Sequence, residues 1–273
     1  MAVTVTAEQA IQALGALAKL ASSLSAPSDT ATILDAIENL SQQMKEGFKY
    51  LSELIEEQTQ IIVNAVNRAA SSAALSNSDT ALLDLENFSG TKKEQYLVSA
   101  EDHSSDGVGF FLELAQASDQ SGKAPFFLPG LAKAGTIWIS VITLDDSNFL
   151  TSRPLAVSTI RQMIGYLGDM IGIVKQTVEA AHTVLLRKEP RQDVPSSVPS
   201  TYYVAVEYVK DAQGKITRNE VGDQHFFKGG SEGAARALAE RDRSAAVAHG
   251  LTSLGIPEFE VILQSWKAAV RMA

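Results

Sequence analysis

Residues Ala124–Thr143 read APFFLPGLAKAGTIWISVIT, and this stretch decides what kind of fold the chain can adopt. Its only charged residue is Lys133. A helix at a protein surface needs a polar stripe, and most of this stretch lacks one, so we expect a helix over 124–144 that is buried on nearly every side. Pro129, Gly130 and Gly135 interrupt the apolar run, which favours a buried core helix over a permanent membrane anchor.

Amphipathic segments flank the apolar stretch on both sides. Apolar residues recur at steps of three or four, as one buried helix face requires, along residues 7–24, 29–71, 92–117 and 152–187. Polar and glycine-containing clusters predict a turn at 76–79, a loop at 87–91 and an interruption at 104–107; a break near 58–60 would also fit. The sequence therefore predicts a mainly α protein, with residues 1–188 forming a multi-helix bundle around the central apolar helix 124–144.

The composition of the chain changes after residue 188. Residues 189–200 are rich in proline and serine and are typical of a linker. The alternating pattern of YYVAVEYVKDAQGKITRNEV, residues 202–221, predicts a β-hairpin, and 225–227 an additional strand. Helices are expected at 231–249 and 258–269. We therefore expect residues 201–273 to form a small α/β extension, a β-hairpin plus two helices, packed on the bundle.

Charge and composition exclude several classes of function. The 273 residues carry a net charge of −9, and the acidity lies in the first half: residues 1–150 contain 8 basic and 19 acidic side chains, whereas 151–273 contain 15 and 13. An acidic bundle argues against a nucleic-acid partner, because phosphate binding requires a basic face. The absence of cysteine excludes disulfides, zinc ribbons and thiol nucleophiles. The first residues, MAVTVTAEQAIQALG, lack the pattern of a secretory signal peptide.

No residue pattern indicates catalysis. The four histidines form no recognised metal-binding spacing and are read as structural residues: His103, His182, His225 and His249. Lys228–Ser231 could hold an anion before a helix, but it lacks the spacing of a phosphate loop, and a glycine hinge explains it more simply. Asp145–Asp146 is read as a solvated end of the central helix. We expect no enzymatic activity, no cofactor and no metal site; an enzyme would need a pocket that gathers His182 or His225 with carboxylates.

The order of elements around FFLPGLAKAGTIWISVITLDDSNF, residues 126–149, resembles the helical pore-forming domain of the three-domain insecticidal crystal toxins (δ-endotoxins). In that family the central helix opens with a leucine–proline turn and small residues, and it ends at an acidic position. The matching positions here are Phe127, Leu128, Pro129, Leu131, Ala132, Ala134, Ile137, Ile139, Leu144 and Asp145. The helix order extends the resemblance loosely over residues 7–187. The family's two β-rich receptor-binding domains have no counterpart in this sequence.

The resemblance implies a non-enzymatic, membrane-active, pore-forming toxin of insecticidal type, soluble and cytoplasmic until it is released and its bundle opens at a target-cell membrane. The hairpin of 92–120 and 124–144 would insert through residues Phe110, Phe111, Phe126, Phe127, Leu128, Leu131, Ile137, Trp138, Ile139 and Ile142. The acidic side of the first helix would face the pore lumen and favour cations: Glu94, Glu101, Asp102, Asp106 and Glu113. A receptor of unknown identity is implied, and assembly into a homo-oligomer is left open. The alternative is a helical interaction or structural protein that self-assembles or binds a protein partner without membrane activity.

Overall fold

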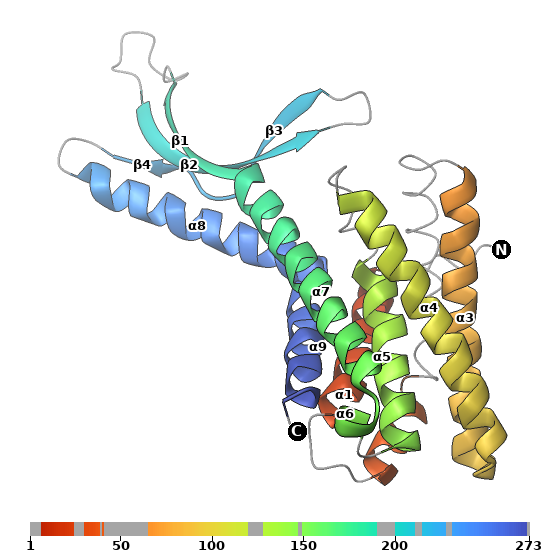
Figure 1. Cartoon of the computed structure of the whole chain (residues 1–273). Helices are drawn as coiled ribbons and strands as arrows, with labels where there is room; N and C mark the ends of the chain where they lie inside the picture. Colours follow the sequence, from red (N-terminus) through yellow and green to blue (C-terminus); the bar gives the residue numbers. More distant parts are fainter. Residues whose placement is uncertain are drawn as a thin grey trace, which may run out of the picture. The chain divides into compact units, whose positions relative to one another are not determined.

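The structure is a computed structural model, and it describes residues 7–24, 30–38, 40, 65–119, 128–146, 149–189, 200–210, 215–227 and 231–271. Helices predominate in these ranges, with one small antiparallel sheet and two C-terminal helices (Figure 1). The predicted mainly α class is therefore confirmed. The chain divides into two compact units, residues 1–173 with 255–273 and residues 174–254.

The first unit consists of helices. Its elements are α1 (Ala7–Ser23), a helical stretch at 30–38, α3 (Ala65–Thr91), α4 (Glu94–Asp119), α5 (Leu128–Asp145), the short α6 (Phe149–Ser152), most of α7 (Pro154–Ala181) and α9 (Ile256–Ala269). Helix α4 packs against α3 and α5, and α1 packs against α5 and α9. Proline occupies the first turn of α5, α7 and α9, where its fixed φ is compatible with the helix and its missing N–H costs no hydrogen bond.

Helices α3 and α4 are longer and more regular than predicted. Helix α3 runs without a break through 76–79 and 87–91, and α4 continues through 104–107, so the predicted turn, loop and interruption are wrong. Hydroxyl side chains are accommodated because they donate to carbonyls of their own helix: Thr80 Oγ1 to Ser76 O at 2.9 Å, and Ser104 Oγ to Ala100 O at 2.6 Å. The extensive packing of α3 on α4 outweighs the weak helix propensity of these serines and glycines.

The helix after the central stretch ends earlier than predicted. We expected it to continue to residue 187, but α7 ends at Ala181 and strand β1 (His182–Glu189) follows directly. Every residue of β1 is paired with one of β2 (Ser200–Lys210), so that Leu185, which lies within the predicted helix 152–187, is opposite Val204. A short apolar run fits either a helix or a strand, and pairing with β2 decides for the strand.

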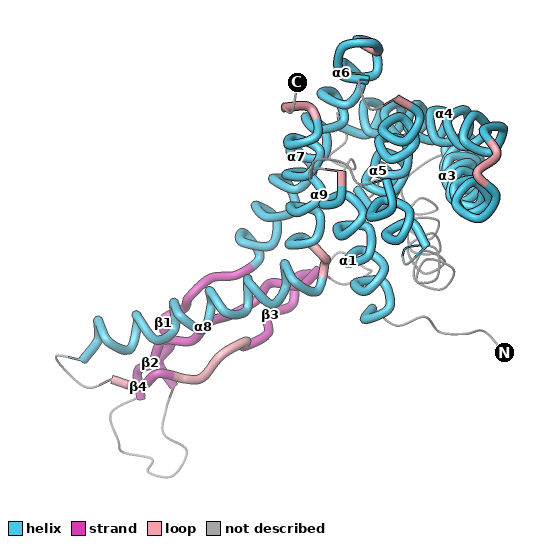
Figure 2. The backbone as a smooth tube through the Cα atoms, turned by 90° about the horizontal axis from the view of Figure 1, so that it is seen from below, coloured by secondary structure: helices cyan, strands magenta, loops and turns pink. Residues whose placement is uncertain are grey.

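The second unit is a small sheet with a helix across it. The strand order is β1–β2–β3, with β3 at Ile216–Glu220, and β4 (His225–Phe226) also pairs with β2; all neighbours are antiparallel. Helix α8 (Glu232–Ser253) packs along β1 and β2 (Figure 2). The predicted hairpin, the strand at 225–226 and the two final helices are thus confirmed. The linker predicted at 189–200 is shorter, because Glu189 ends β1 and Ser200 begins β2. Its residues 190–199, the connection 211–214 between β2 and β3, and the possible break at 58–60 lie outside the described residues.

The two faces of β2 bury different sets of side chains. Tyr203 packs with Ala235 and Ala239 of α8, whereas Tyr202, Val204 and Val206 form a second apolar cluster on the opposite face. Helix α9, although last in the sequence, belongs to the first unit, where it packs on α1 and α5.

Candidate functional site

Helix α5 is buried along nearly its whole length. Of its 18 residues, 14 are buried, and only Pro129 and the last three are more exposed. The predicted insertion residues on α5 are all buried: Leu128, Leu131, Ile137, Trp138, Ile139 and Ile142. On α4, Phe111 is also buried and Phe110 is partly exposed, while Phe126 and Phe127 lie outside the described residues. The expected apolar helix is therefore present, and α1, α3, α4 and α9 pack against it.

Two glycines allow aromatic rings to approach the backbone of α5. A Cβ atom added at Gly130 would lie 2.2 Å from the Phe111 ring of α4. At Gly135 the added atom would lie 2.2 Å from Met163 Cε of α7 and 2.6 Å from the Trp266 ring of α9. Any larger residue would collide at either position, so these glycines fix how neighbouring helices pack on α5.

Lys133, the only charged residue in the quoted stretch, is fully buried in the middle of α5. Its ammonium forms an ion pair with the carboxylate of Asp79 on α3. The side chain of Lys133 is 0% exposed and that of Asp79 is 61% exposed, so the pair joins a buried cation to a carboxylate at the surface. Burial is the largest influence on Lys133 and lowers its pKa, while the charge and hydrogen bond of Asp79 oppose that shift.

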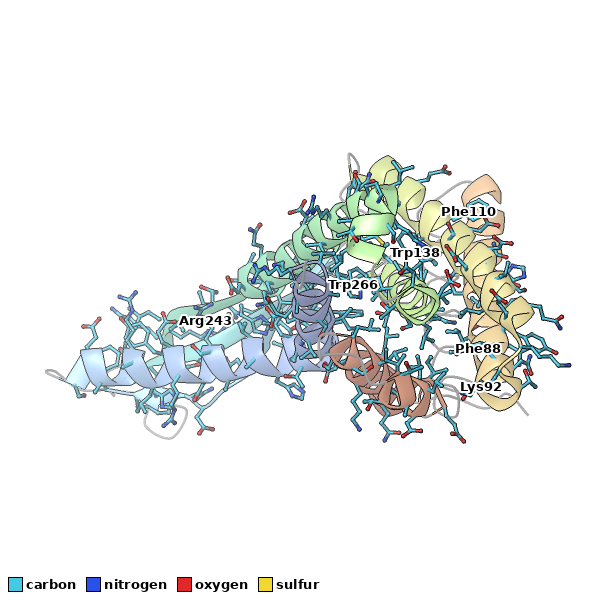
Figure 3. The ribbon with its side chains drawn as sticks, turned by 60° about the horizontal axis from the view of Figure 1, so that its bottom comes forward. Phe88, Lys92, Phe110, Trp138, Arg243 and Trp266 are labelled. Atoms are coloured by element: carbon cyan, nitrogen blue, oxygen red, sulfur yellow. The ribbon has the colours of Figure 1, made fainter. Side chains whose placement is uncertain are left out.

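Trp266 of α9 forms a buried polar contact with α5. Its indole Nε1–H donates to Thr136 Oγ1 at 3.1 Å, and the Trp266 side chain is fully buried. Figure 3 shows Trp266 on α9 facing the helix that carries Trp138. Other hydroxyls of α5 bond within the helix: Ser140 Oγ donates to Thr136 O and Thr143 Oγ1 to Ile139 O, both at 2.7 Å. Thr136 therefore differs from them in accepting a hydrogen bond from another helix.

Arg153, immediately before α7, connects the C-terminal end of α5 with α4. Its guanidinium contacts Glu101 Oε1 of α4 at 2.6 Å and also pairs with Asp145 of α5. Asp146 accepts a hydrogen bond from the Ser152 hydroxyl. The helix dipole disfavours carboxylates at a helix C-terminus, and these contacts compensate for it. The two aspartates are therefore held by cationic and hydroxyl partners.

The acidic residues predicted to face a lumen divide into two groups. Glu94, Asp102, Asp106 and Glu113 are exposed on α4. Glu101 is half-buried and paired with Arg153. Four of the five carboxylates thus lie on the surface of the protein, where water solvates them, and the fifth forms an ion pair with Arg153.

Two of the four histidines, His182 and His225, make separate contacts within the second unit, and His249 is exposed. His182 Nδ1 lies 2.8 Å from Val178 O, and His225 Nε2 lies 2.7 Å from Asp242 Oδ2 on α8. The hydrogen bond from His225 is the main cause that lowers the pKa of Asp242, and the backbone N–H of Asp223 adds to it. Within the described ranges, no group of three or more His, Asp or Glu side chains is arranged to hold a metal ion.

Sequence reasoning missed the partners of α5. Asp79 was assigned to a turn, and neither Trp266 nor Thr136 was linked to the other. A lone lysine in an apolar helix signals that a carboxylate must lie nearby, but only the packing of α3 on α5 shows which one.

Among the helices that the structure describes, none is both long and apolar enough to cross a membrane.

A scan against protein-family models and searches among curated proteins and solved structures found no match to this chain. The resemblance to the δ-endotoxin pore-forming domain therefore stays a prediction that rests on residues 126–149 and on the order of the helices.

Proposed function

We propose that this chain is a membrane-active, pore-forming protein of the toxin type, closed until its bundle opens at a target membrane. The observation that carries the proposal is the burial of α5, an apolar helix covered by helices that precede and follow it in the sequence. Covering by separate helices matters because each is attached to α5 by side-chain contacts that can be exchanged for contacts with lipid. The inserting element would be the hairpin of α4 and α5.

The charges of the hairpin fit this proposal. The cation of α5, Lys133, is compensated by Asp79 in the closed form and would need a new partner or water after opening. The exposed carboxylates of α4, including Asp102 and Asp106, would face the aqueous side of a pore and attract cations. Opening would also break the contacts of Arg153 with Glu101 and Asp145, since these join the two helices of the hairpin through a residue outside it.

The direct test is dye release from lipid vesicles. Purified full-length protein is added to vesicles of neutral lipid with and without anionic lipid, at several pH values and with or without limited proteolysis. We expect leakage under at least one of these conditions, together with co-sedimentation of the protein with the vesicles. If the vesicles stay sealed under every condition, the pore-forming proposal is wrong.

The side of α4 that lines the pore can be tested by ion selectivity in planar bilayers. We expect the pore to prefer cations and the double variant Asp102→Asn/Asp106→Asn to reduce that preference. Asp169→Asn is the matched control, because Asp169 is an exposed carboxylate on α7, outside the hairpin. An equal effect of both substitutions would remove α4 from the pore lining.

The second candidate is a protein-interaction role without membrane activity, and exposed apolar side chains of the sheet favour it. Ile216 is 65% exposed and Phe226 is 59% exposed, on the same sheet face as the buried Tyr202 cluster. Apolar surface of this kind marks docking sites in many proteins. Size-exclusion chromatography with light scattering distinguishes the candidates: a defined oligomer that binds no vesicles supports the interaction role.

A further inference from the structure

Helix α9 packs mainly on α1 and also contacts α5. Its buried face carries Ile256, Phe259, Ile262, Leu263 and Trp266, whereas Val261 on the opposite face is 43% exposed. Helix α5 is buried on all sides over 130–142. A helix with one buried face has less surface to expose on leaving than a helix buried all round, so α9 can detach at lower cost than α5.

The contact that fixes α9 on α5 is small and specific. The Trp266 ring occupies the notch formed by Gly135 and Thr136, where only the missing side chain of the glycine leaves room for it. The hydrogen bond from Trp266 Nε1–H to Thr136 Oγ1 sets the depth and orientation of the ring. Trp266 thus fixes the register of α9 on the central helix, while α1 supplies most of the surface on which α9 packs.

The connection before α9 has the geometry of a hinge. Helix α8 ends at Ser253, Leu254 is 52% exposed, and Gly255 has a φ of 69°, in the left-handed region that favours glycine. The boundary between the two compact units also falls between Leu254 and Gly255. Rotation at this point would move α9 without unfolding either α8 or α9.

One group in the first turn of α9 opposes its docking. Glu258 Oε2 is buried and has no hydrogen-bond partner among the residues that the structure describes. The N-terminal helix dipole compensates the carboxylate only in part, and a buried polar atom without a partner weakens the state that buries it. Undocking α9 would return this oxygen to water.

We propose that α9 is a retaining helix: docked through Trp266 it holds α5 inside the bundle, and it turns away at Leu254–Gly255 before α5 can leave. This inference rests on the proposed pore-forming function for its purpose, but the order of opening is a property of the protein alone. Undocking of α9 exposes the Gly135–Thr136 notch and removes one wall around α5. Helix α5 then leaves the bundle.

Hydrogen exchange of the full chain in water tests the order of opening without any membrane. We expect the amides of α9 to exchange through local opening, faster than those of α5. Thr136→Val leaves the Trp266 N–H buried without an acceptor, and a loss of about 1 kcal/mol would accelerate exchange in α9 about fivefold. Thr143→Val is the matched control, because its hydroxyl bonds within α5, and it should leave exchange in α9 unchanged. Exchange of α9 and α5 in one common transition would overturn the inference.

A reversible tether tests whether undocking of α9 is required for leakage. The chain has no cysteine, so a pair introduced as Gly168→Cys/Leu263→Cys can link only α7 to α9. A Cβ at position 168 would lie 3.7 Å from Leu263 Cδ2, so the two positions are neighbours, and a short thiol-reactive linker that contains a cleavable disulfide can join the two cysteines. We expect the closed tether to suppress dye release at least tenfold and reduction of the disulfide to restore it.

The hydrogen-exchange and tether experiments together distinguish failure of this inference from failure of the proposed function. If the tethered protein releases dye as fast as its reduced form, α9 is no retaining helix, although pore formation stands. If wild-type protein releases no dye at all, the pore-forming function fails, and hydrogen exchange still decides whether α9 opens before α5.

Discussion

Removing the carboxylate of Asp79 should destabilise the first unit through the buried charge of Lys133. Breaking a fully buried ion pair from one side costs about 4 kcal/mol, and an exposed pair is worth only about 0.5 kcal/mol. The present pair lies between these limits, because Lys133 is 0% and Asp79 is 61% exposed. We therefore expect Asp79→Asn to lower the free energy of unfolding by about 2 kcal/mol, since the ammonium stays buried while an amide replaces its counter-charge.

Lys133→Met should behave in the opposite way. It removes the buried charge, keeps a flexible side chain of similar length, and leaves Asp79 in contact with water, so its stability should equal or exceed that of the wild type. In the double variant, Asp79→Asn should then have almost no further effect. Urea unfolding of the four proteins gives the coupling energy of a double-mutant cycle, for which we expect about 2 kcal/mol.

The pH dependence gives a second readout of the same pair. Burial holds the pKa of Lys133 below its ordinary value of 10.5, so the folded protein releases this proton at a lower pH than the unfolded chain. In the window between the folded pKa and 10.5, the unfolded state binds more protons, and the contribution of Lys133 to stability rises with pH. Wild type should therefore gain stability relative to Lys133→Met as the pH rises through this window. A coupling energy below about 0.5 kcal/mol would refute the reasoning, because the pair would then be worth no more than one at the surface.

Three further substitutions test local features against matched controls. Gly135→Ala should lower the free energy of unfolding, measured in urea, by about 1–3 kcal/mol, because the new methyl group meets Met163 and Trp266. The control Gly165→Ala on α7, where no atom lies within 4 Å of the new Cβ, should raise the free energy of unfolding. Equal effects of the two substitutions would contradict the close packing at α5. Lys92 directly follows α3, has a φ of 57° and lies over the Phe88 ring. Lys92→Gly should raise the melting temperature slightly, because about 1 kcal/mol of relieved strain exceeds about 0.5 kcal/mol of lost cation–π contact. Lys93→Gly should lower it. The hydrogen bond from His225 lowers the pKa of Asp242 below 3.8. The wild type should therefore be more stable than Asp242→Asn above pH 3.8, and this difference should disappear as the pH falls through the pKa of the folded protein. A difference that persists when unfolding is measured at lower pH would disprove the role of the carboxylate charge.

The sequence predicted those parts of the fold that depend on local patterns. A nearly uncharged run over 124–144, flanked by amphipathic segments, favoured a buried helix, and the alternation after Tyr202 favoured a strand. It failed where tertiary packing overrides propensity: α3 passes straight through Ser76–Asp79, and residues 182–189 became β1 because β2 was available to pair with them.

Partnerships between distant residues were beyond single-sequence reasoning. The sequence identified Lys133 as the only charged residue of the apolar stretch, but its contact with Asp79 and the contact of Trp266 with Thr136 depend on the axial register of packed helices, which no local pattern encodes. The sequence places the five acidic residues on one helix, but the ion pair of Glu101 with Arg153 depends on where α7 begins.

The contact of Trp266 with Thr136 joins residues 130 positions apart and has a consequence for biosynthesis. During translation, α5 is synthesised long before Trp266, which packs on it. The nascent chain therefore exposes part of an apolar helix while roughly the second half of the protein is being made. Contacts of such high sequence separation also slow folding, because a large loop must close before the contact forms. Truncation before residue 266 should therefore yield a chain that binds chaperones and aggregates.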